Sequence, residues 1–409
     1  MKKNDIIVIG GGPAGLFCSL LSSRRGFNTL LLEKMSSCGR KLLLSGSGQC
    51  NLTHTGPISE FVSHYGNNGK FIRPALMNFT NEDLISFFTD RGVPFHDDGR
   101  GKYFPESGKS RDILTVLLNE AEKAGVSIHT NEPVIKIIHD VSGFTVTSRL
   151  DTYHTDVLVL ATGGCTYPAT GSTGDGYAYA KNLGHTIENP GPALTPAHVP
   201  DFSLQDLSGI SFSDVPVFLY RGNKKIYQAK GDLLITHTGF SGPVILDMSR
   251  YFRSGDELRI SFLSFKNINT AREELISLLS SGGVKQVKTI LTSLSLPERF
   301  AKKVMELAGI PPDTTSAQFS KDLRNRLLTM ILEFPVREMR PGGANEAMVS
   351  RGGVILDEVR KNSMESRIVP GLYFIGEILD IDGDCGGYNL QAAFSTGALA
   401  AENIKKNEK

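Results

Sequence analysis

The feature that most constrains this fold is a glycine-rich turn close to the N-terminus, Gly10-Gly11-Gly12-Pro13-Ala14-Gly15. It follows a short apolar run, 5–9, that predicts a buried strand. Helically spaced residues 16–25 come next and end at Gly26, a typical residue just beyond a helix C-terminus. A second predicted strand, 29–33, completes a strand–turn–helix–strand unit of about thirty residues. A chain that begins in this way is expected to form a Rossmann-like α/β sheet.

The turn has the spacing G-x-G-x-x-G, in which each glycine has its own purpose. Gly10 permits the tight turn, Gly12 lets the backbone approach a pyrophosphate, and Gly15 lets the helix pack on the strand. Pro13 and Ala14 begin the helix, whose N-terminal N–H groups attract an anion. Glu33, eighteen residues after Gly15, can accept both hydroxyls of an adenosine ribose. An acid there favours FAD or NAD over a phosphorylated ribose. The alternative, a turn without ligand, is disfavoured by the flanking strand, helix and acid.

A long loop without periodicity, 36–55, follows the second strand. Its positive charges, small residues and side-chain amide suit a diphosphate and the polar edge of a flavin ring, although a solvated basic loop is the alternative. The candidate cofactor contacts in and just before this loop are Lys34, Gly39, Arg40, Lys41, Ser45, Gly46, Cys50 and Asn51.

A second candidate segment follows the apolar strand predicted at 157–161. The run Ala161, Thr162, Gly163 and Gly164 resembles the second FAD signature of flavoproteins with two dinucleotide-binding domains. The residues 167–176 then lead into a predicted helix, with Asp175 as its expected N-cap. A purely structural strand-to-helix turn is the alternative.

A third candidate segment lies near the C-terminus, where a predicted strand, 371–375, is followed by a glycine pair and a last helix, 390–405. The positive end of such a helix suits the N1–C2=O edge of a reduced flavin. The acids at 380–384 lack the length and final Glu of a calcium loop, so no metal is expected. The candidate cofactor contacts are Gly376, Glu377, Gly387, Tyr388, Asn389 and Leu390.

Together these motifs resemble those of the HI0933-like flavoproteins, a family that includes bile-acid reductases and aminoacetone oxidases and is related in fold to fumarate reductases. The matching patterns are G-R-K-x-x-x-S-G-x-G-x-C-N-x-T at 39–53, T-Y-P-x-T-G-S-T-G-D-G at 166–176, L-L-x-T-H-x-G-x-S-G-P at 233–243 and G-E-x-L-D-x-x-G-x-C-G-G-Y-N-L-Q at 376–391. Ser47 stands where the family has a third glycine, and Ser350 where it has a threonine.

The expected architecture is an FAD-binding domain of the two-dinucleotide-binding-domain type, interrupted by an inserted domain. Prolines at 190, 192, 196 and 200 mark a predicted linker or crossing. Strand-like and then helical stretches follow them, so the insertion is expected to be a mixed β/α substrate or cap domain. We place the FAD domain at 1–190 and 341–409 and the insertion at 191–340.

The resemblance implies an FAD-dependent oxidoreductase that binds its flavin non-covalently. The expected reaction is hydride transfer through flavin N5, from NAD(P)H to an enone or related small organic substrate. Tyr388, His237 and Arg351 are the candidate proton donors. An amine oxidase that uses dioxygen is the alternative within enzymes. A flavoprotein acting on tRNA and a non-catalytic flavin-binding protein are the alternatives from other classes.

Composition limits the partners that the chain is expected to have. The 44 lysines and arginines nearly balance the 43 aspartates and glutamates, and no basic cluster occurs, so a nucleic-acid partner is not expected. The chain has no apolar stretch of about 18 residues, so no membrane span is expected. The cysteines lack any C-x-x-C pair, which favours a reducing, cytoplasmic environment. They are Cys18, Cys38, Cys50, Cys165 and Cys385.

Overall fold

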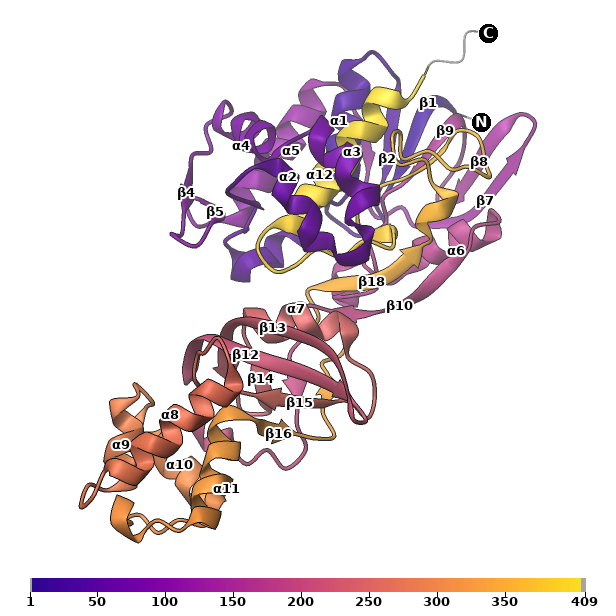
Figure 1. Ribbon diagram of the computed structural model, residues 1–409. Coiled ribbons are helices and arrows are strands. Elements are labelled where there is room, and N and C mark those ends of the chain that lie inside the picture. Colours follow the sequence, from indigo (N-terminus) through magenta and orange to yellow (C-terminus); the bar gives the residue numbers. More distant parts are fainter. Residues whose placement is uncertain (1, 406–409) are drawn as a thin grey trace. The chain divides into compact units, whose positions relative to one another are not determined.

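The N-terminal strand β1 (Lys2–Ile9) lies at the centre of a parallel sheet in the computed structural model, which describes residues 2–405 (Figure 1). β2 (Thr29–Leu32) pairs with one edge of β1 and β9 (Thr152–Leu160) with the other, both in parallel. The apolar residues of all three strands are buried, as expected of a parallel sheet covered on both faces. The N-terminal turn predicts this arrangement.

The sheet continues on both sides of this centre and draws on both ends of the chain. Its order is β6 (Ser127–His129), β2, β1, β9, β8 (Gly143–Ser148) and β7 (Val134–Asp140), and β19 (Leu372–Phe374) pairs in parallel with the last residues of β9. β7, β8 and the first half of β9 form an antiparallel meander. The carboxyl ends of β1, β9 and β19 therefore meet at one edge, which is where parallel sheets bind ligands.

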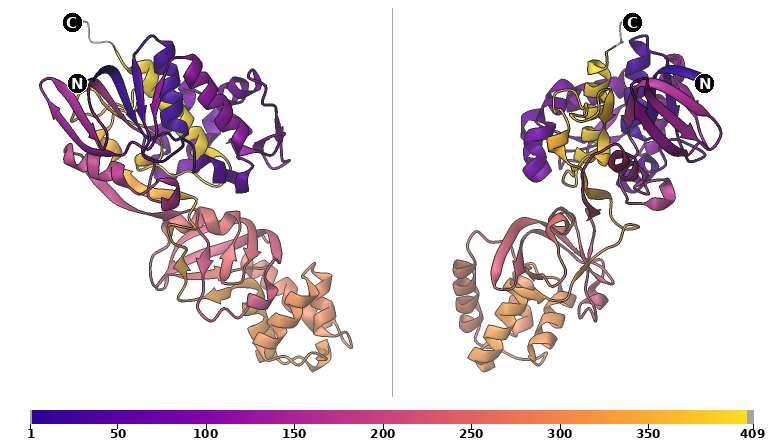
Figure 2. Two further views of the ribbon diagram at one scale, coloured as in Figure 1. Left: turned by 180° about the vertical axis from the view of Figure 1, so that it is seen from behind. Right: turned by 90° about the vertical axis from the view of Figure 1, so that its right-hand side faces the viewer.

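Two helices from opposite ends of the sequence, α1 (Pro13–Arg24) and α12 (Tyr388–Asn403), pack against each other. Gly397 permits this approach, since a Cβ there would lie 2.9 Å from the carbonyl oxygen of Ala14. Gly26, with φ of +84°, follows the C-cap of α1 as predicted. The other helices of this part are α2 (Ile58–Phe61), α3 (Gly69–Asn78), α4 (Asn81–Thr89), α5 (Ser110–Lys123) and α6 (Asp175–Asn182). Figures 1 and 2 show α1, α3, α5 and α12 together beside the large sheet.

A small antiparallel sheet extends from this helical layer. It consists of β3 (Thr53–His54), β5 (Lys102–Pro105) and β4 (Phe95–Asp97) in that order.

Two of the prolines near residue 190, where a linker or crossing is predicted, lie within a strand. Pro190 and Pro192 lie inside β10 (Ile187–Ala193), which pairs antiparallel with β18 (Val349–Val354). A bulge between Glu188 and Gly191 interrupts the register at Pro190, so no ladder hydrogen bond is required from its nitrogen. A two-stranded ribbon with free edges tolerates prolines that a central strand would not.

The chain divides into two compact units. The first contains the residues up to Ala193 and from Ala344 onward, and the second is Leu194–Gly343, beginning and ending three residues later than the predicted insertion. The second unit has its own apolar core, with Phe240, Phe262 and Phe300 fully buried.

The second unit contains an antiparallel sheet and five helices. The strand order is β16 (Phe334–Val336), β15 (Glu257–Ile260), β12 (Ser211–Arg221), β13 (Lys224–Ile235), β14 (Gly239–Ser241), β11 (Ala197–His198) and β17 (Arg340–Pro341). The helices are α7 (Pro243–Met248), α8 (Ile268–Ser281), α9 (Val287–Ser293), α10 (Glu298–Ala308) and α11 (Lys321–Leu332).

Within residues 2–405, no helix combines the length and the apolar character that a bilayer crossing requires. The same residues contain no group of three or more His, Cys, Asp or Glu side chains arranged to hold a metal ion.

Candidate functional site

The glycines of the N-terminal turn differ in what surrounds them. Gly10 has φ of +111°, and a Cβ there would lie 2.4 Å from the carbonyl oxygen of Ala161. A Cβ on Gly15 would lie 2.0 Å from the carbonyl oxygen of Gly10. A Cβ on Gly12, by contrast, would meet no atom within 4 Å, although Gly12 is the N-cap of α1 and no side chain caps that end. The space above Gly12 is open and faces free helix N–H groups, as the approach of a pyrophosphate requires.

Glu33 follows β2 and points at the same turn. Its Oε2 accepts a hydrogen bond from the N–H of Gly11 at 2.8 Å, and its Oε1 accepts one from the N–H of Met35 at 2.8 Å. Two backbone donors thus fix the carboxylate beside the turn, and its other lone pairs are available to ribose hydroxyls.

The loop after Glu33 is folded into a short 3₁₀ segment, η1 (Leu42–Gly48), with several left-handed residues. Ser47, which stands where the family has a glycine, has a left-handed backbone with φ of +56°. Glycine would adopt this conformation more easily. Gly46 is left-handed too, and Ser45 donates its hydroxyl to the carbonyl of Leu42 at 2.7 Å. Gly39, with φ of +69°, packs its Cα against Leu114.

Two residues of this loop have opposite environments. Cys50 is fully buried, and desolvation raises the pKa of its thiol to about 12, so it is not a thiolate at neutral pH. Arg40 is half-buried, and its guanidinium forms no hydrogen bond or ion pair with the described residues. Arg40 is therefore the cation of the loop that is available to an anionic ligand.

The residues after β9 lie against the N-terminal turn. The N–H of Ala161 donates to the carbonyl of Ile9 at 2.9 Å, and Gly163 is left-handed with φ of +73°. The hydroxyl of Thr162 is buried and has no hydrogen-bond partner among the described residues. A buried hydroxyl without a partner is costly, and a polar ligand over the turn would satisfy it.

Asp175 is not the N-cap of α6 that the sequence predicts. The N-cap is Gly174, in a left-handed conformation with φ of +81° that glycine adopts readily, and Asp175 is the first helical residue. Its carboxylate forms an ion pair with Lys34, with Nζ 2.6 Å from Oδ2, and this pairing lowers its pKa against the effect of desolvation. Lys34 and Asp175 thus neutralise each other rather than presenting separate charges to a ligand.

The C-terminal segment returns to the turn through Gly376. This residue has φ of +71°, its N–H donates to the Thr396 hydroxyl at 3.0 Å, and a Cβ on it would lie 3.0 Å from the Cβ of Ala14. α12 then begins after Gly387, its N-cap, whose φ is +92° and which has no side-chain cap. Three helices of this unit, α1, α6 and α12, therefore begin after a glycine N-cap without a side-chain cap, at Gly12, Gly174 and Gly387.

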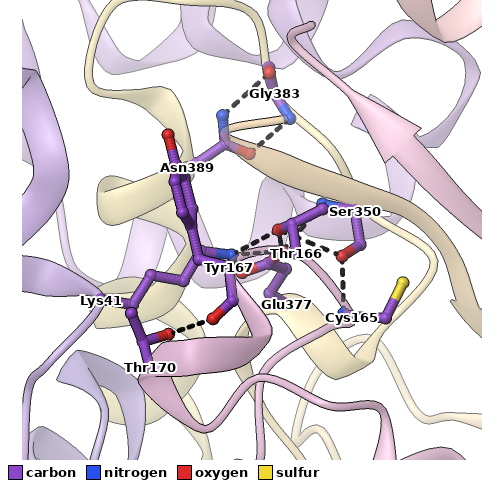
Figure 3. A network of polar contacts seen from close by, with 9 residues as sticks. All are labelled: Lys41, Cys165, Thr166, Tyr167, Thr170, Ser350, Glu377, Gly383 and Asn389. Carbon is purple, nitrogen blue, oxygen red and sulfur yellow. Dashed lines mark hydrogen bonds and ion pairs between the residues drawn. The ribbon is translucent and has the colours of Figure 1, made fainter. Parts of the chain in front are cut away.

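Two asparagines hold the backbone around the start of α12. Asn389 forms a two-way bridge to Gly383, accepting from its N–H at 2.8 Å and donating to its carbonyl at 2.9 Å (Figure 3). The Asn51 amide, in the orientation that satisfies both of its groups, accepts from the N–H of Gly387 at 3.2 Å and donates to the carbonyl of Thr53 at 3.1 Å. Leu390 packs on the apolar cluster beside α1. Both amides thus act on the protein backbone.

Four segments of the first unit, represented by Lys41, Thr166, Ser350 and Glu377, meet in one polar network, shown in Figure 3. Lys41 Nζ lies 2.7 Å from Glu377 Oε2 and 2.7 Å from the Thr166 hydroxyl. Glu377 Oε1 also accepts from the N–H of Ser350 at 2.8 Å. The Ser350 hydroxyl accepts from the N–H of Cys165 at 2.8 Å, and a Cβ on Gly164 would collide with it. The network fixes the relative positions of loops from four distant parts of the sequence.

The three candidate proton donors have different environments. Tyr388 is only 3% exposed, and its ring lies nearly parallel to those of His64 and His54, with centroids 4.1 and 5.2 Å away. Arg351 is partly buried in β18 against Gly191. His237 is exposed in the turn between β13 and β14 of the second unit. Tyr388 and Arg351 thus belong to the first unit and His237 to the second, and the Tyr388 ring is packed against two imidazoles.

The structure reveals one titratable pair that the sequence does not predict. His64 Nδ1 lies 3.0 Å from Asp384 Oδ2, and the backbone N–H of Asp384 donates to the His64 carbonyl at 2.9 Å. Asn68 and Tyr65 add hydrogen bonds to the backbone of Asp380 and Tyr388. No periodicity or motif in 56–80 predicts this contact, because it depends on a segment more than 300 residues later.

The residues present fit FAD. The open space over Gly12, the fixed carboxylate of Glu33 and the unsatisfied hydroxyl of Thr162 lie along the carboxyl edge of β1, β2 and β9. The uncapped start of α12 offers partial positive charge to the flavin end.

Comparison with known proteins gives full-length matches. The family model described as "HI0933-like protein Rossmann domain" matches residues 4–403. The ribosomal RNA dihydrouridine synthase of Escherichia coli K12 is 31% identical over 99% of this chain and 98% of its own length. That of Haemophilus influenzae is 32% identical over 99% of both. The 3-dehydro-bile acid delta(4,6)-reductase of Clostridium scindens is 28% identical over 97% of this chain and 98% of its own.

Solved structures agree in fold. An open-conformation flavocytochrome c3 fumarate reductase matches with a TM-score of 0.52 and 15% identity, over 98% of this chain and 78% of its own. The 3-ketosteroid-delta4-(5alpha)-dehydrogenase of Rhodococcus jostii RHA1 matches with a TM-score of 0.52 and 17% identity, over 98% and 97%. The predicted Rossmann-like FAD fold is thereby confirmed.

Proposed function

The chain belongs to the HI0933-like family and is an FAD-dependent oxidoreductase, and we propose that it reduces a carbon–carbon double bond conjugated to a carbonyl group, in uridine of ribosomal RNA. The observation that carries this proposal is the full-length similarity to two ribosomal RNA dihydrouridine synthases. The resemblance seen in the sequence motifs is confirmed by the family match.

The named relatives share one kind of chemistry. The C5=C6 bond of uracil is conjugated to the C4 carbonyl, and the delta(4,6) double bonds of a 3-dehydro bile acid are conjugated to its ketone. In each case a hydride adds to a carbon made electrophilic by conjugation with the carbonyl, and a proton completes the reduction; in uracil the hydride adds to C6, the β carbon, and the proton to C5, the α carbon. The enone reduction expected from the sequence is therefore the same reaction class as dihydrouridine formation.

The chain's own residues divide this work. The turn at Gly12 and the start of α1 would hold the pyrophosphate, and Glu33 the adenosine ribose. Glu377 and Thr162 would offer oxygens to the flavin side, and FAD, when bound and reduced by NAD(P)H, would supply a hydride from N5. The positive start of α12 would stabilise negative charge on the reduced ring.

The charge distribution supports an RNA substrate better than the whole-chain balance suggests. The second unit carries 19 lysines and arginines against 15 aspartates and glutamates, whereas the remaining residues carry 25 against 28. The net charge of the whole chain is therefore near zero because a positive unit and a negative unit cancel. The expectation of no nucleic-acid partner rests on that sum. A net positive unit favours contact with phosphates.

The test is an anaerobic assay with two half-reactions. NADPH and NADH are each mixed with the purified holoenzyme under nitrogen. Loss of the visible absorbance of the oxidised flavin reports its reduction. The reduced enzyme is then mixed with a ribosomal RNA transcript, and nuclease digests are analysed by mass spectrometry. We expect dihydrouridine, with a gain of two hydrogen atoms, at a defined position.

The same assay has informative controls. Transcript binding should weaken steeply with added salt, as expected of phosphate contacts. If no dihydrouridine forms in the transcript and a small enone such as cyclohex-2-enone is reduced quickly, the substrate is a small molecule and not RNA. Peroxide formed from aminoacetone without any reductase activity would favour the amine oxidase instead.

A further inference from the structure

Tyr167 lies in the loop between β9 and α6, on the carboxyl edge of the sheet, and has a strained backbone. Its φ of 52° and ψ of 58° are left-handed, a conformation that is costly for a residue with a Cβ. The surrounding chain holds it there: its N–H donates to the carbonyl of Ala344 at 2.8 Å, and its carbonyl accepts from the Thr170 hydroxyl at 2.7 Å. Glycine would relieve this strain, so a tyrosine here indicates a need for the side chain.

The Tyr167 side chain extends from this loop without a polar partner among residues 2–405. The residue is partly exposed, and its phenol forms no hydrogen bond, ion pair or ring contact with the described residues. Figure 3 shows the ring projecting away from the polar network of Lys41, Thr166 and Glu377. A half-buried tyrosine normally places its hydroxyl on a partner, so a free one is available to a ligand.

The residues next to Tyr167 are anchored to the segments that would hold the flavin. The hydroxyl of Thr166, which is fully buried, accepts from Lys41 at 2.7 Å. The N–H of Cys165 donates to the Ser350 hydroxyl at 2.8 Å. The backbone that carries the phenol is thus held in place at the edge of the sheet where β1, β9 and β19 end.

We propose that Tyr167 is the proton donor for the reduction. This inference rests on the proposed function. In uracil, C6 gains the hydride from the reduced flavin, and C5 gains the proton from the Tyr167 hydroxyl. The C5=C6 π bond breaks, two C–H bonds form, and the phenolate regains a proton from water. Tyr388 is buried against two imidazoles, and Arg351 does not release a proton readily, so among Tyr388, Arg351 and Tyr167 of this unit it is Tyr167 that offers an accessible O–H.

Tyr167→Phe tests the proposal because it removes only the hydroxyl. Tyr179→Phe is the matched control: its hydroxyl also lies in this unit but donates to the carbonyl of Val134 at 2.7 Å. Reduced holoenzyme is mixed anaerobically with a ribosomal RNA transcript or with cyclohex-2-enone, and flavin reoxidation is followed. We expect Tyr167→Phe to slow reoxidation by about 100-fold or more, a usual contribution of a general acid. Its reduction by NADPH and its binding of transcript should match wild type, as should reoxidation of Tyr179→Phe.

A second measurement does not depend on activity. Tyr167→Gly and Tyr167→Ala both remove the phenol, but only glycine adopts the left-handed backbone without strain, so the glycine variant should unfold at a temperature a few degrees higher. The same unfolding temperature for both would overturn the claim of strain. Wild-type reoxidation by Tyr167→Phe, or a change in transcript binding alone, would overturn the proton-donor role while leaving the proposed function intact. Wild-type enzyme that neither probe reoxidises would overturn both.

Discussion

Lys41 and Glu377 lie 336 residues apart in the chain, and their side chains form an ion pair with Nζ 2.7 Å from Oε2. About a fifth of each side chain is exposed. Because Glu377 also accepts from the backbone of Ser350, the pair joins the first glycine-rich loop to β18 and to the segment after β19. The two halves of the interrupted FAD unit are connected at this point by charge as well as by the sheet.

This ion pair should contribute measurably to stability. Lys41→Met leaves the Glu377 carboxylate partly buried without its cation, so we expect a loss of about 1–3 kcal/mol in the free energy of unfolding. A double-mutant cycle with Glu377→Gln, measured by urea unfolding of the apoprotein, should give a coupling of about 1 kcal/mol.

The exposed helical pair Lys302–Glu298, at 2.8 Å, is the matched control for this cycle. It should couple by only about 0.3–0.5 kcal/mol, as surface i,i+4 pairs do. Equal coupling in the two pairs would show that burial and the added hydrogen bonds give Lys41–Glu377 no advantage.

The turn glycines should separate ligand binding from folding. Gly12→Ala meets no protein atom, so the apoprotein should unfold at the wild-type temperature, yet the added methyl occupies the space proposed for the pyrophosphate. We expect its affinity for FAD, measured by flavin fluorescence, to fall at least about tenfold, or roughly 1.4 kcal/mol.

Gly15→Ala should behave in the opposite way. Its Cβ would lie 2.0 Å from the carbonyl of Gly10, so the backbone must shift and the apoprotein itself should be destabilised. If Gly12→Ala binds FAD as tightly as wild type, the pyrophosphate does not lie over this turn.

Thiol labelling should distinguish the buried cysteines from the others. Burial raises the pKa of Cys18, Cys38 and Cys50 to about 12, so these thiols should resist iodoacetamide at mildly alkaline pH. Cys165 and Cys385 are partly exposed and should be alkylated first in the native protein, as mass spectrometry would reveal. Labelling of all five should require urea, and native labelling of Cys38 at the rate of Cys165 would contradict the burial of the loop beside Gly11.

Sequence reasoning succeeds where the determining interactions are local. The Gly10, Gly12 and Gly15 turn, the C-terminal Gly26 of α1 and the position of Glu33 follow from spacing over about thirty residues, and the structure places each of them as that spacing requires. The main helices of the second unit likewise match stretches with helical periodicity, such as α11 (Lys321–Leu332).

Sequence reasoning does not identify the distant partners of a side chain. Lys34 and Asp175 each suggest a ligand contact or a cap, but their side chains pair with each other across 141 residues. The ring of Tyr388 stacks with those of His54 and His64, more than 300 residues earlier in the chain, which no local pattern indicates. Neither partner could be assigned without knowing which loops the parallel sheet brings to its carboxyl edge.

Buried His185 should make stability depend on pH. Its side chain is fully buried, with Nδ1 3.0 Å from Glu358 Oε2 and Nε2 2.9 Å from the Ser366 hydroxyl. Desolvation lowers its pKa below the ordinary 6.5, and this effect outweighs the opposing charge of Glu358. Because the folded pKa lies below the unfolded one, the stabilisation is fully present above 6.5 and is lost as the pH falls through the folded value.

Unfolding temperatures at about pH 8 and about pH 5.5 would test this dependence. Wild type should be less stable at the lower pH, and His185→Gln, which cannot take up a proton, should lose less stability between the two. His96→Gln is the control, since His96 is exposed, and it should show the wild-type dependence. If His185→Gln and wild type show the same pH dependence, other groups cause the loss of stability at low pH. His185 would then be protonated at little cost in the folded protein.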